Sequence, residues 1–239
     1  LGEITAANRY LGGEERVHNI VLMGSGEPLD NYDNVCRFLR LLREEDGVNI
    51  GLRNVSLSTC GLVPKMYQFA EENLPVTLSV SLHAPNDEIR RQTMPVANAY
   101  PMDELLAATI AAADAQYRAY SADFVRDSAD PPYKAVGTAY IRFARNEPNL
   151  FHLLYMRDRR REDHSGDAEN IAVLVDFLMA KLSLTREDAT LLHIEMWAYV
   201  HGIAVLCASG QQNWDDALIS RMLTDGFEGI KSRFQKNEQ

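Results

Sequence analysis

Over the first hundred residues, short apolar runs alternate with amphipathic segments. Runs of this length that end in turn residues are typical of buried strands, whereas apolar positions three and four apart indicate helices. Strand and helix in regular alternation predict parallel strands joined by right-handed crossovers, as in a (β/α) barrel or an open sheet. The expected strands cover residues 18–24, 54–59 and 75–82, and the expected helices cover 32–45 and 64–72.

From about residue 102 the strand pattern disappears and amphipathic helices follow one another. Pro132 and Pro148 favour new helices at their positions, because proline is well tolerated in the first turn. This change predicts two domains, residues 1–101 with an α/β fold and residues 102–239 with an all-α bundle. The expected helices cover residues 102–126, 133–146, 148–156, 167–182, 185–210 and 214–234.

Three loops with glycine or small polar residues follow the three expected strands, at residues 24–28, 58–61 and 81–85. In parallel α/β folds, ligands bind at the carboxyl ends of the strands, and glycine lets the backbone approach them closely. Glu27 offers a hydrogen-bond acceptor for an amino group or a ribose. The simpler interpretation of each loop, taken alone, is a turn without a ligand.

Together, the stretches GSGEPLDNYDNV, STCGLVP and SVSLHAPNDEIRRQTMPVANAYPMDELL resemble the dual-specificity radical-SAM RNA methyltransferases of the RlmN type. The resemblance covers about residues 2–107 and implies three βα units of a partial TIM-type barrel. Ser25 and Cys60 depart from the usual family residues. By the same resemblance, the side chains or backbone expected to contact S-adenosylmethionine are Gly26, Glu27, Ser58, Ser81, Leu82 and His83.

The cysteines do not have the spacing of an iron–sulfur site. Cys36, Cys60 and Cys207 lie far apart in the sequence, whereas the family holds its [4Fe–4S] cluster with a CxxxCxxC loop. The methyl-carrying cysteine of the family has no counterpart here either. We therefore expect no metal site, no catalytic residue and no radical chemistry from this chain, and an incomplete barrel with exposed strand edges.

The second half resembles the C-terminal, ligand-binding domain of TetR-family regulators. The resemblance rests on AYIRFARNEPNLFHLLYM and on MWAYVHGIAVLCASG, which holds a Trp-x-x-x-His-Gly pattern. It implies an apolar effector pocket and a homodimer formed by the last two helices, at about 186–209 and 214–234. Candidate pocket residues are Tyr140, Phe143, Phe151, Tyr155, Trp197 and His201, for each of which core packing is the alternative.

The net charge of −10 disfavours binding to polyanions, so we expect neither RNA nor DNA as a partner. A helix-turn-helix, which TetR repressors use to read DNA, is not evident in the sequence. No uninterrupted apolar run reaches membrane-spanning length, roughly 18–20 residues, and scattered cysteines fit a reducing cytoplasm. We therefore expect a cytoplasmic protein without a membrane span.

The stretch YPMDELLAA at residues 100–108 fits both families, so the chain is interpreted as a chimera joined there. Three hypotheses remain open. The chain is a dimeric effector-binding module carrying a non-catalytic α/β fragment, a truncated methyltransferase that retains S-adenosylmethionine binding, or a natural fusion that senses a small molecule. Whether the fusion is natural or arose by an error of sequence assembly also remains open.

Overall fold

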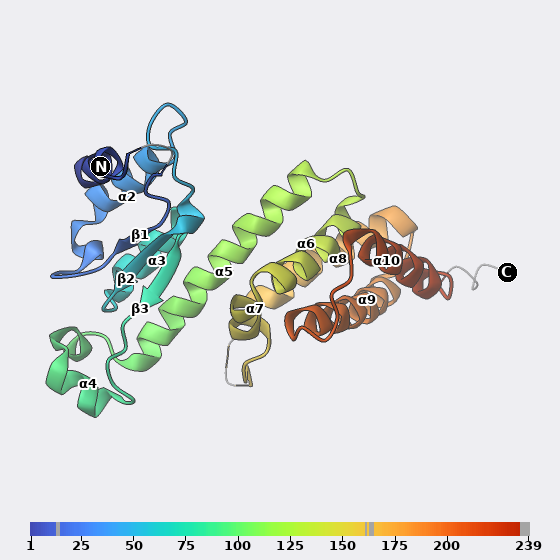
Figure 1. Ribbon diagram of the computed structural model, residues 1–239. Helices are drawn as coiled ribbons and strands as arrows, with labels where there is room; N and C mark the ends of the chain where they lie inside the picture. The colour runs from blue at the N-terminus through green and yellow to red at the C-terminus, as the bar shows by residue number, and fades with distance from the viewer. Residues whose placement is uncertain (13–14, 161, 163–164, 235–239) are drawn as a thin grey trace. The chain divides into compact units, whose positions relative to one another are not determined.

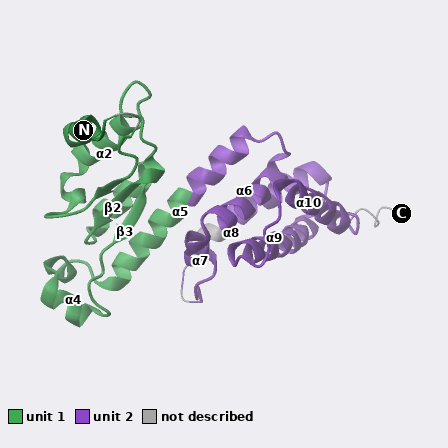
Figure 2. Cartoon of the chain, viewed as in Figure 1, with its two compact units in different colours: residues 1–116 green, residues 117–239 purple. Residues whose placement is uncertain are grey.

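A computed structural model of the chain describes residues 1–12, 15–160, 162 and 165–234. The chain forms two compact units, residues 1–116 and 117–239 (Figure 2). Unit 1 contains a parallel sheet with helices, and unit 2 contains helices (Figure 1). The predicted fold class, an α/β segment with three strand–helix repeats followed by a helical bundle, is confirmed.

The sheet of unit 1 has the order β1-β2-β3, and both pairings are parallel, as the alternating pattern predicted. The central strand contributes Val55 and Leu57, both fully buried, to the core. The elements of unit 1 are α1 (Gly2–Leu11), β1 (Ile20–Leu22), α2 (Tyr32–Leu42), β2 (Val55–Thr59), α3 (Val63–Glu71), β3 (Thr77–Val80) and α4 (Asp87–Thr93), with 3-10 turns at Pro28–Asn31, Leu52–Asn54 and Pro95–Asn98.

Helix α5 (Met102–Asp127) begins within unit 1. Its Leu105 and Ala108 are fully buried in the core of that unit. The Met102 amide donates to Asp87 Oδ1 at 3.0 Å. Arg90, fully buried, donates to the carbonyl oxygens of Tyr100 at 2.9 Å and Cys60 at 2.8 Å. The first turns of α5 are therefore packed in unit 1. The domain boundary predicted between residues 101 and 102, where segments of two families are expected to meet, stays a prediction.

Unit 2 is arranged around α9, which packs against α6, α8 and α10. Thr185 and Asp215 accept hydrogen bonds from backbone amides in the first turns of α9 and α10, which stabilises both helix starts. The helices that follow α5 are α6 (Pro132–Asn146), α7 (Pro148–Tyr155), α8 (Ser165–Leu182), α9 (Arg186–Ala208) and α10 (Asp216–Lys231).

One face of α9 carries large apolar side chains that unit 2 leaves in solvent. Leu191, Ile194 and Trp197 are each about half exposed, at 46, 52 and 53%. By length and composition alone α9 is apolar enough to cross a membrane, a property that the prediction of no membrane span had not anticipated. Core helices of soluble proteins share these features, so this observation is weak evidence for a span.

Candidate functional sites

The first loop of unit 1 contains two glycines in a backbone conformation that side chains disfavour. Gly24 has a φ of 134° and Gly26 a φ of 127°. These values lie where a Cβ would be strained, so the turn after β1 depends on glycine. The turn brings Glu27 back toward the loop that follows β2.

Glu27 joins these two loops through both oxygens of its carboxylate. Oε1 accepts from the Leu29 amide at 3.0 Å, and Oε2 accepts from the Cys60 amide at 2.7 Å. Burial and the neighbouring Glu27 raise the pKa of the Cys60 thiol to about 11. Cys60 is therefore a protonated thiol at neutral pH, and Glu27 holds the first and second loops together.

The third loop meets the second through hydroxyl groups. Ser58 Oγ and Ser81 Oγ are 3.2 Å apart, and the Ser81 amide donates to the Thr59 carbonyl at 2.9 Å. Leu82 packs against the core of unit 1, whereas His83 is exposed with a φ of 57°. The structure therefore brings Ser58 and Ser81 together, and Glu27 joins the glycine loop to Cys60. Leu82 instead belongs to the core, and His83 lies on the surface.

The residues that the structure describes do not fit an iron–sulfur cluster. Cys36 is buried on α2, Cys60 lies after β2 and Cys207 belongs to α9 in unit 2. In the part of the chain that the structure describes, no group of three or more His, Cys, Asp or Glu side chains could hold a metal ion. No reaction step through such a cluster can be built on the described residues.

In unit 2, a hydrogen bond between α6 and α9 lies within a cluster of aromatic rings. The Tyr140 hydroxyl lies 2.9 Å from His201 Nδ1, and Tyr140 is 8% exposed. Burial raises the pKa of Tyr140 and lowers that of His201. Both groups are therefore neutral at pH 7, and one hydrogen bond joins the phenol to the imidazole. Phe143 and Phe151 are buried beside them.

The ring cluster includes residues that the sequence had placed only on the apolar side of a helix. Tyr117 of α5 contacts Tyr140, Phe143 and Tyr155, with ring centroids 6.1, 4.9 and 5.7 Å away. Tyr120 contacts Phe143 at 5.9 Å. Helical spacing indicated that Tyr117 and Tyr120 face inward, but it could not identify which rings they would meet.

Trp197 lies at the outer edge of this cluster. It stacks on His201 with ring centroids 5.2 Å apart and an interplanar angle of 11°, and about half of it stays exposed. Three of the other five predicted pocket residues therefore lie in ring contact with Tyr140, namely Phe151, Tyr155 and His201. Phe143 is connected to Tyr140 through Tyr117, and Trp197 stacks on His201 from the exposed side.

A second tyrosine–histidine pair repeats this arrangement along the same two helices. The Tyr133 hydroxyl lies 3.0 Å from His193 Nδ1, and His193 is buried. Burial raises the pKa of Tyr133 and lowers that of His193. Since each pair joins α6 to α9, the two bonds fix the register of these helices at two levels.

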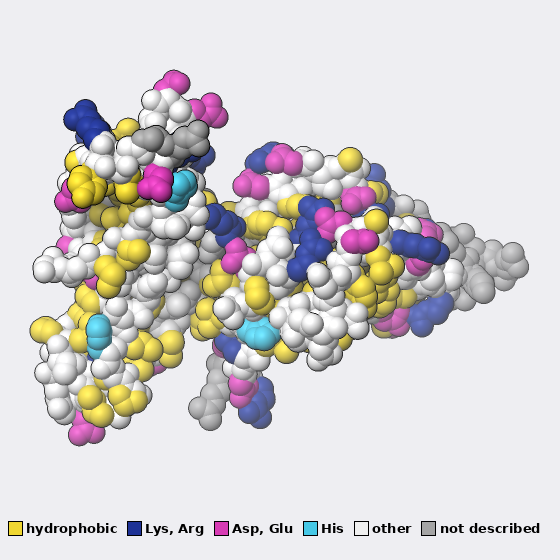
Figure 3. Space-filling model, viewed as in Figure 1, with side chains coloured by type: hydrophobic (Ala, Val, Ile, Leu, Met, Phe, Trp, Pro, Cys, Tyr) yellow, Lys and Arg dark blue, Asp and Glu magenta, His cyan; other side chains and the backbone are white. Residues whose placement is uncertain are grey.

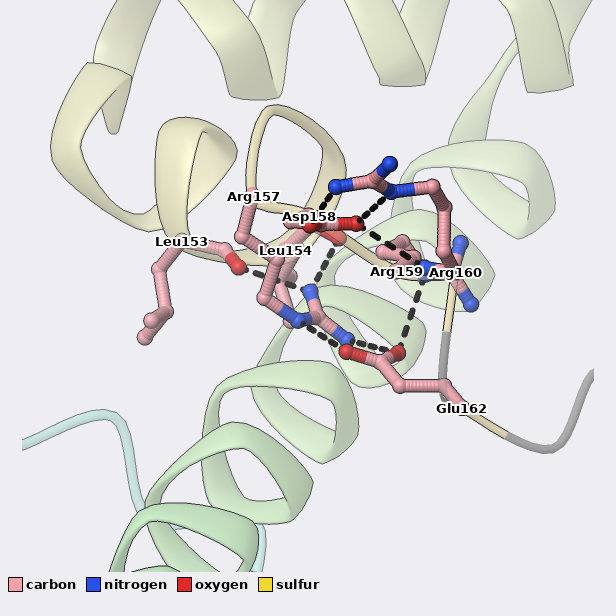
Figure 4. A network of polar contacts seen from close by, with 7 residues as sticks. All are labelled: Leu153, Leu154, Arg157, Asp158, Arg159, Arg160 and Glu162. Carbon is pink, nitrogen blue, oxygen red and sulfur yellow. Dashed lines mark hydrogen bonds and ion pairs between the residues drawn. The ribbon is translucent and has the colours of Figure 1, made fainter.

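In the charged stretch after α7, Glu162 is the shared carboxylate partner of two arginines (Figure 4). Arg157 donates to both carboxylate oxygens of Glu162 at 2.7 Å and to the Leu153 carbonyl at 2.7 Å. Arg159 donates to Glu162 Oε2 at 3.1 Å, whereas Arg160 pairs with Asp158 instead. On the face of unit 2 shown in Figure 3, acidic and basic side chains are interspersed, without a patch of one sign.

Comparison with known proteins defines the class of the first segment. Residues 2–124 match the radical SAM superfamily, so the chain belongs to that superfamily. More particularly, the chain is 58% identical over 108 residues to the probable dual-specificity RNA methyltransferase RlmN of Clostridium tetani, which covers 45% of this chain and 30% of that protein. The same enzyme of Thermoanaerobacter sp. (strain X514) is 58% identical over 93 residues, which covers 39% of this chain and 27% of that protein.

The chain is also similar to the crystal structure of a radical SAM methyltransferase from Sphaerobacter thermophilus, with 43% sequence identity and a TM-score of 0.44. The match covers 47% of this chain and 33% of that protein chain. The chain thus spans about three-tenths of the length of its curated relatives. Residues 133–225 match a different family, the tetracyclin repressor-like C-terminal domain. The interpretation of the chain as a chimera of these two families is confirmed.

Proposed function

We propose that the chain acts as a dimeric, effector-binding regulatory module attached to a non-catalytic radical SAM fragment. The observation that carries this proposal is the aromatic cluster around the Tyr140–His201 hydrogen bond, within the segment similar to repressor effector domains. Apolar rings with few polar groups are typical of small-molecule sites. Tyr140, Phe143, Phe151, Tyr155, Trp197 and His201 are the proposed effector contacts.

The exposed apolar face of α9 supports a homodimer. Along this face Leu191 and Ile194 are followed by the small residues Ala198 and Gly202 and then by Val205. Leu218 of α10 is also exposed. Small residues let two helices approach closely, and an exposed apolar face of this kind marks an interaction surface. A second copy of the chain can bury this face about a twofold axis.

Sedimentation velocity at micromolar concentration tests the dimer. Ile194→Glu places a charge on the apolar face and should give a monomer, because burying an unpaired carboxylate costs several kcal/mol, on the order of 3–5. Val173→Glu on α8 is the matched control, since Val173 is also exposed but lies outside the last two helices. A monomeric wild-type protein would contradict the proposed interface.

Thermal stabilisation by a panel of small hydrophobic compounds tests the effector site. A compound that binds the cluster should raise the unfolding temperature of unit 2. We place the protein in the cytoplasm, which the free cysteines support. We also propose that the chain itself does not bind RNA or DNA, so gel shift with random DNA should be negative.

A second candidate function, binding of S-adenosylmethionine, is favoured by the convergence of Glu27, Ser58 and Ser81 at the carboxyl ends of the strands. The superfamily uses S-adenosylmethionine and an iron–sulfur cluster, and Gly26, Leu82 and His83 are the further proposed contacts. Calorimetry with S-adenosylmethionine tests this. Glu27→Gln should weaken binding about tenfold or more, whereas Glu71→Gln, on the exposed side of α3, should not.

A further inference from the structure

The Trp-x-x-x-His-Gly pattern brings its three residues together at the exposed apolar face of α9. The Trp197 and His201 rings are stacked, with centroids 5.2 Å apart and planes 11° from parallel, and Trp197 stays 53% exposed. Gly202 is exposed, and a Cβ added there would meet nothing within 4 Å in the part of the chain that the structure describes. One helix therefore offers a half-exposed aromatic surface next to a position without a side chain.

His201 connects this surface to the interior of unit 2. Its Nδ1 atom lies 2.9 Å from the hydroxyl of the buried Tyr140, and its ring contacts the ring of the buried Phe151, with centroids 5.9 Å apart. The imidazole thus contacts Trp197 at the surface and two rings of the aromatic cluster inside. Whatever covers or moves Trp197 therefore acts on His201 and, through one hydrogen bond, on Tyr140.

A second copy of the chain fits the face around Trp197. The exposed side chains of this face are uncharged, so two identical faces meet without like-charge repulsion; they are Leu191, Ile194, Trp197, Ala198 and Gly202. The carboxylate of Glu195 on the same helix is already paired with Arg233 of α10. Ala198 and Gly202 are one turn apart, and small side chains at a contact let two helix axes approach closely. A helix seated there lies against the exposed side of the Trp197 ring.

We propose that a second copy of the chain covers the Trp197–His201 stack, so that the dimer interface forms one wall of the effector cluster. The proposal rests on the proposed function, a dimer with an effector site, and states how these two properties are coupled. The coupling is reciprocal: an effector that moves His201 changes the affinity between the copies by the factor by which dimerisation changes the affinity for the effector. The effector site of a single copy is therefore incomplete.

Acrylamide quenching of Trp197 fluorescence in the full chain tests whether the interface covers the stack. Trp214→Phe leaves Trp197 as the single tryptophan, and sedimentation velocity on the same samples gives the fraction of dimer. Trp197 should be quenched as a half-exposed indole in the dilute monomer and should lose most of that quenching in the dimer. Equal quenching in monomer and dimer overturns the proposal, whereas the absence of any dimer removes the proposed function on which it rests.

Gly202→Leu provides the monomer reference. The added side chain meets open space within one copy, but it clashes where the second helix is seated. Dimerisation should therefore be lost while unit 2 stays folded, which far-ultraviolet circular dichroism checks. Ala172→Leu on α8 is the matched control, because Ala172 is exposed and lies outside the last two helices. A Gly202→Leu protein that dimerises as tightly as the wild type also overturns the proposal.

A matched pair of substitutions tests the coupling. Tyr140→Phe removes the hydroxyl that is bonded to His201 beneath Trp197, and it should raise the Kd of the dimer about fivefold, the worth of one hydrogen bond. Tyr133→Phe removes the same kind of bond between the same two helices, but its partner His193 is buried and is not part of the stack, so the Kd should not change. Equal Kd values in the two variants overturn the coupling, whether both are raised or both stay at the wild-type value.

Discussion

At the residue scale, Gly61 occupies a position that no other residue can fill without strain. Its φ is +100°, and a Cβ placed there would lie 2.7 Å from Leu105 Cδ1 and 3.3 Å from Arg90 Nη2. Gly61→Ala should lower the free energy of unfolding of unit 1 by roughly 2–4 kcal/mol, from backbone strain plus overpacking. Urea unfolding followed by circular dichroism measures this.

Gly12→Ala is the control for that substitution, because Gly12 has a φ of +69° but nothing lies within 4 Å of its added Cβ. It should cost only the backbone strain, about 1–2 kcal/mol. Equal losses for Gly61→Ala and Gly12→Ala would show that the contact with Leu105 does not contribute.

Two histidines of α9, the buried His193 and the partly buried His201, make stability depend on pH. Burial lowers the pKa of His193 and His201 below the ordinary value of 6.5. The unfolded chain takes up protons near 6.5, whereas the folded chain takes them up only at lower pH. The stabilising contribution is therefore fully present above about pH 6.5, and it is lost as pH falls from there toward the folded pKa.

Urea midpoints at about pH 7.5 and pH 5.5 should accordingly show weaker folding of unit 2 at the lower pH. His193→Gln should reduce this difference, and His152→Gln, an exposed site on α7, should leave it intact. A pH dependence that persists unchanged in His193→Gln and His201→Gln would assign it to other groups.

The sequence could not predict which tyrosine of α6 bonds to which histidine of α9. His201 and Tyr140 were both predicted as site residues, yet their hydrogen bond joins positions 61 residues apart. Helical periodicity gives the inward face of each helix but not the register between two helices. Tyr133–His193 was missed for the same reason, although Tyr133 and His193 are as buried as the predicted pair.

At the scale of elements, strongly periodic segments were predicted well. β2 (Val55–Thr59) and α5 (Met102–Asp127) begin within one residue of their predicted starts. α1 (Gly2–Leu11) and α4 (Asp87–Thr93) were missed. In α1 only Ile4 is buried, and in α4 only Arg90 is, so neither helix has the apolar stripe that periodicity detects.

The candidate sites were predictable to different degrees. The loops of unit 1 lie where parallel strands end, which topology dictates once the strands are recognised. The bond from Cys60 to Glu27 depends on the turn made by Gly24 and Gly26, which sequence alone does not specify. The Trp197 side chain was expected inside the pocket, but its exposure depends on the rotation of α9.

Replacing either of two glycines of α10 by alanine should have opposite effects on stability. A Cβ at Gly226 would lie 2.7 Å from Tyr199 Cε1 of α9, whereas nothing lies within 4 Å of one at Gly229. Alanine gains roughly 0.5–1 kcal/mol over glycine in a helix interior, and overpacking costs roughly 1–3 kcal/mol. Gly226→Ala should therefore destabilise unit 2 and Gly229→Ala should stabilise it.

Thermal unfolding of both variants checks this, with Tyr199→Leu as a second change that should relieve Gly226→Ala. If Gly226→Ala stabilises the protein as much as Gly229→Ala does, the approach of α9 and α10 at this point is looser than the structure has it.

At the scale of the whole molecule, each unit has its own apolar core. Compact units with separate cores generally fold as separate cooperative transitions. Differential scanning calorimetry should therefore resolve two transitions. Gly61→Ala should lower the temperature of one, and Gly226→Ala should lower that of the other. A single transition shifted by both variants would contradict this.

The three-stranded sheet has a consequence for the life of the protein in a cell. Both outer strands, β1 and β3, pair on one side only within the part of the chain that the structure describes. Val21 in β1 and Met23, the residue after it, are 57 and 71% exposed. Unpaired strand edges with apolar neighbours are what chaperones and proteases select, and what seeds aggregation. The abundance of the chain would then be governed by unit 1, whichever unit carries its activity.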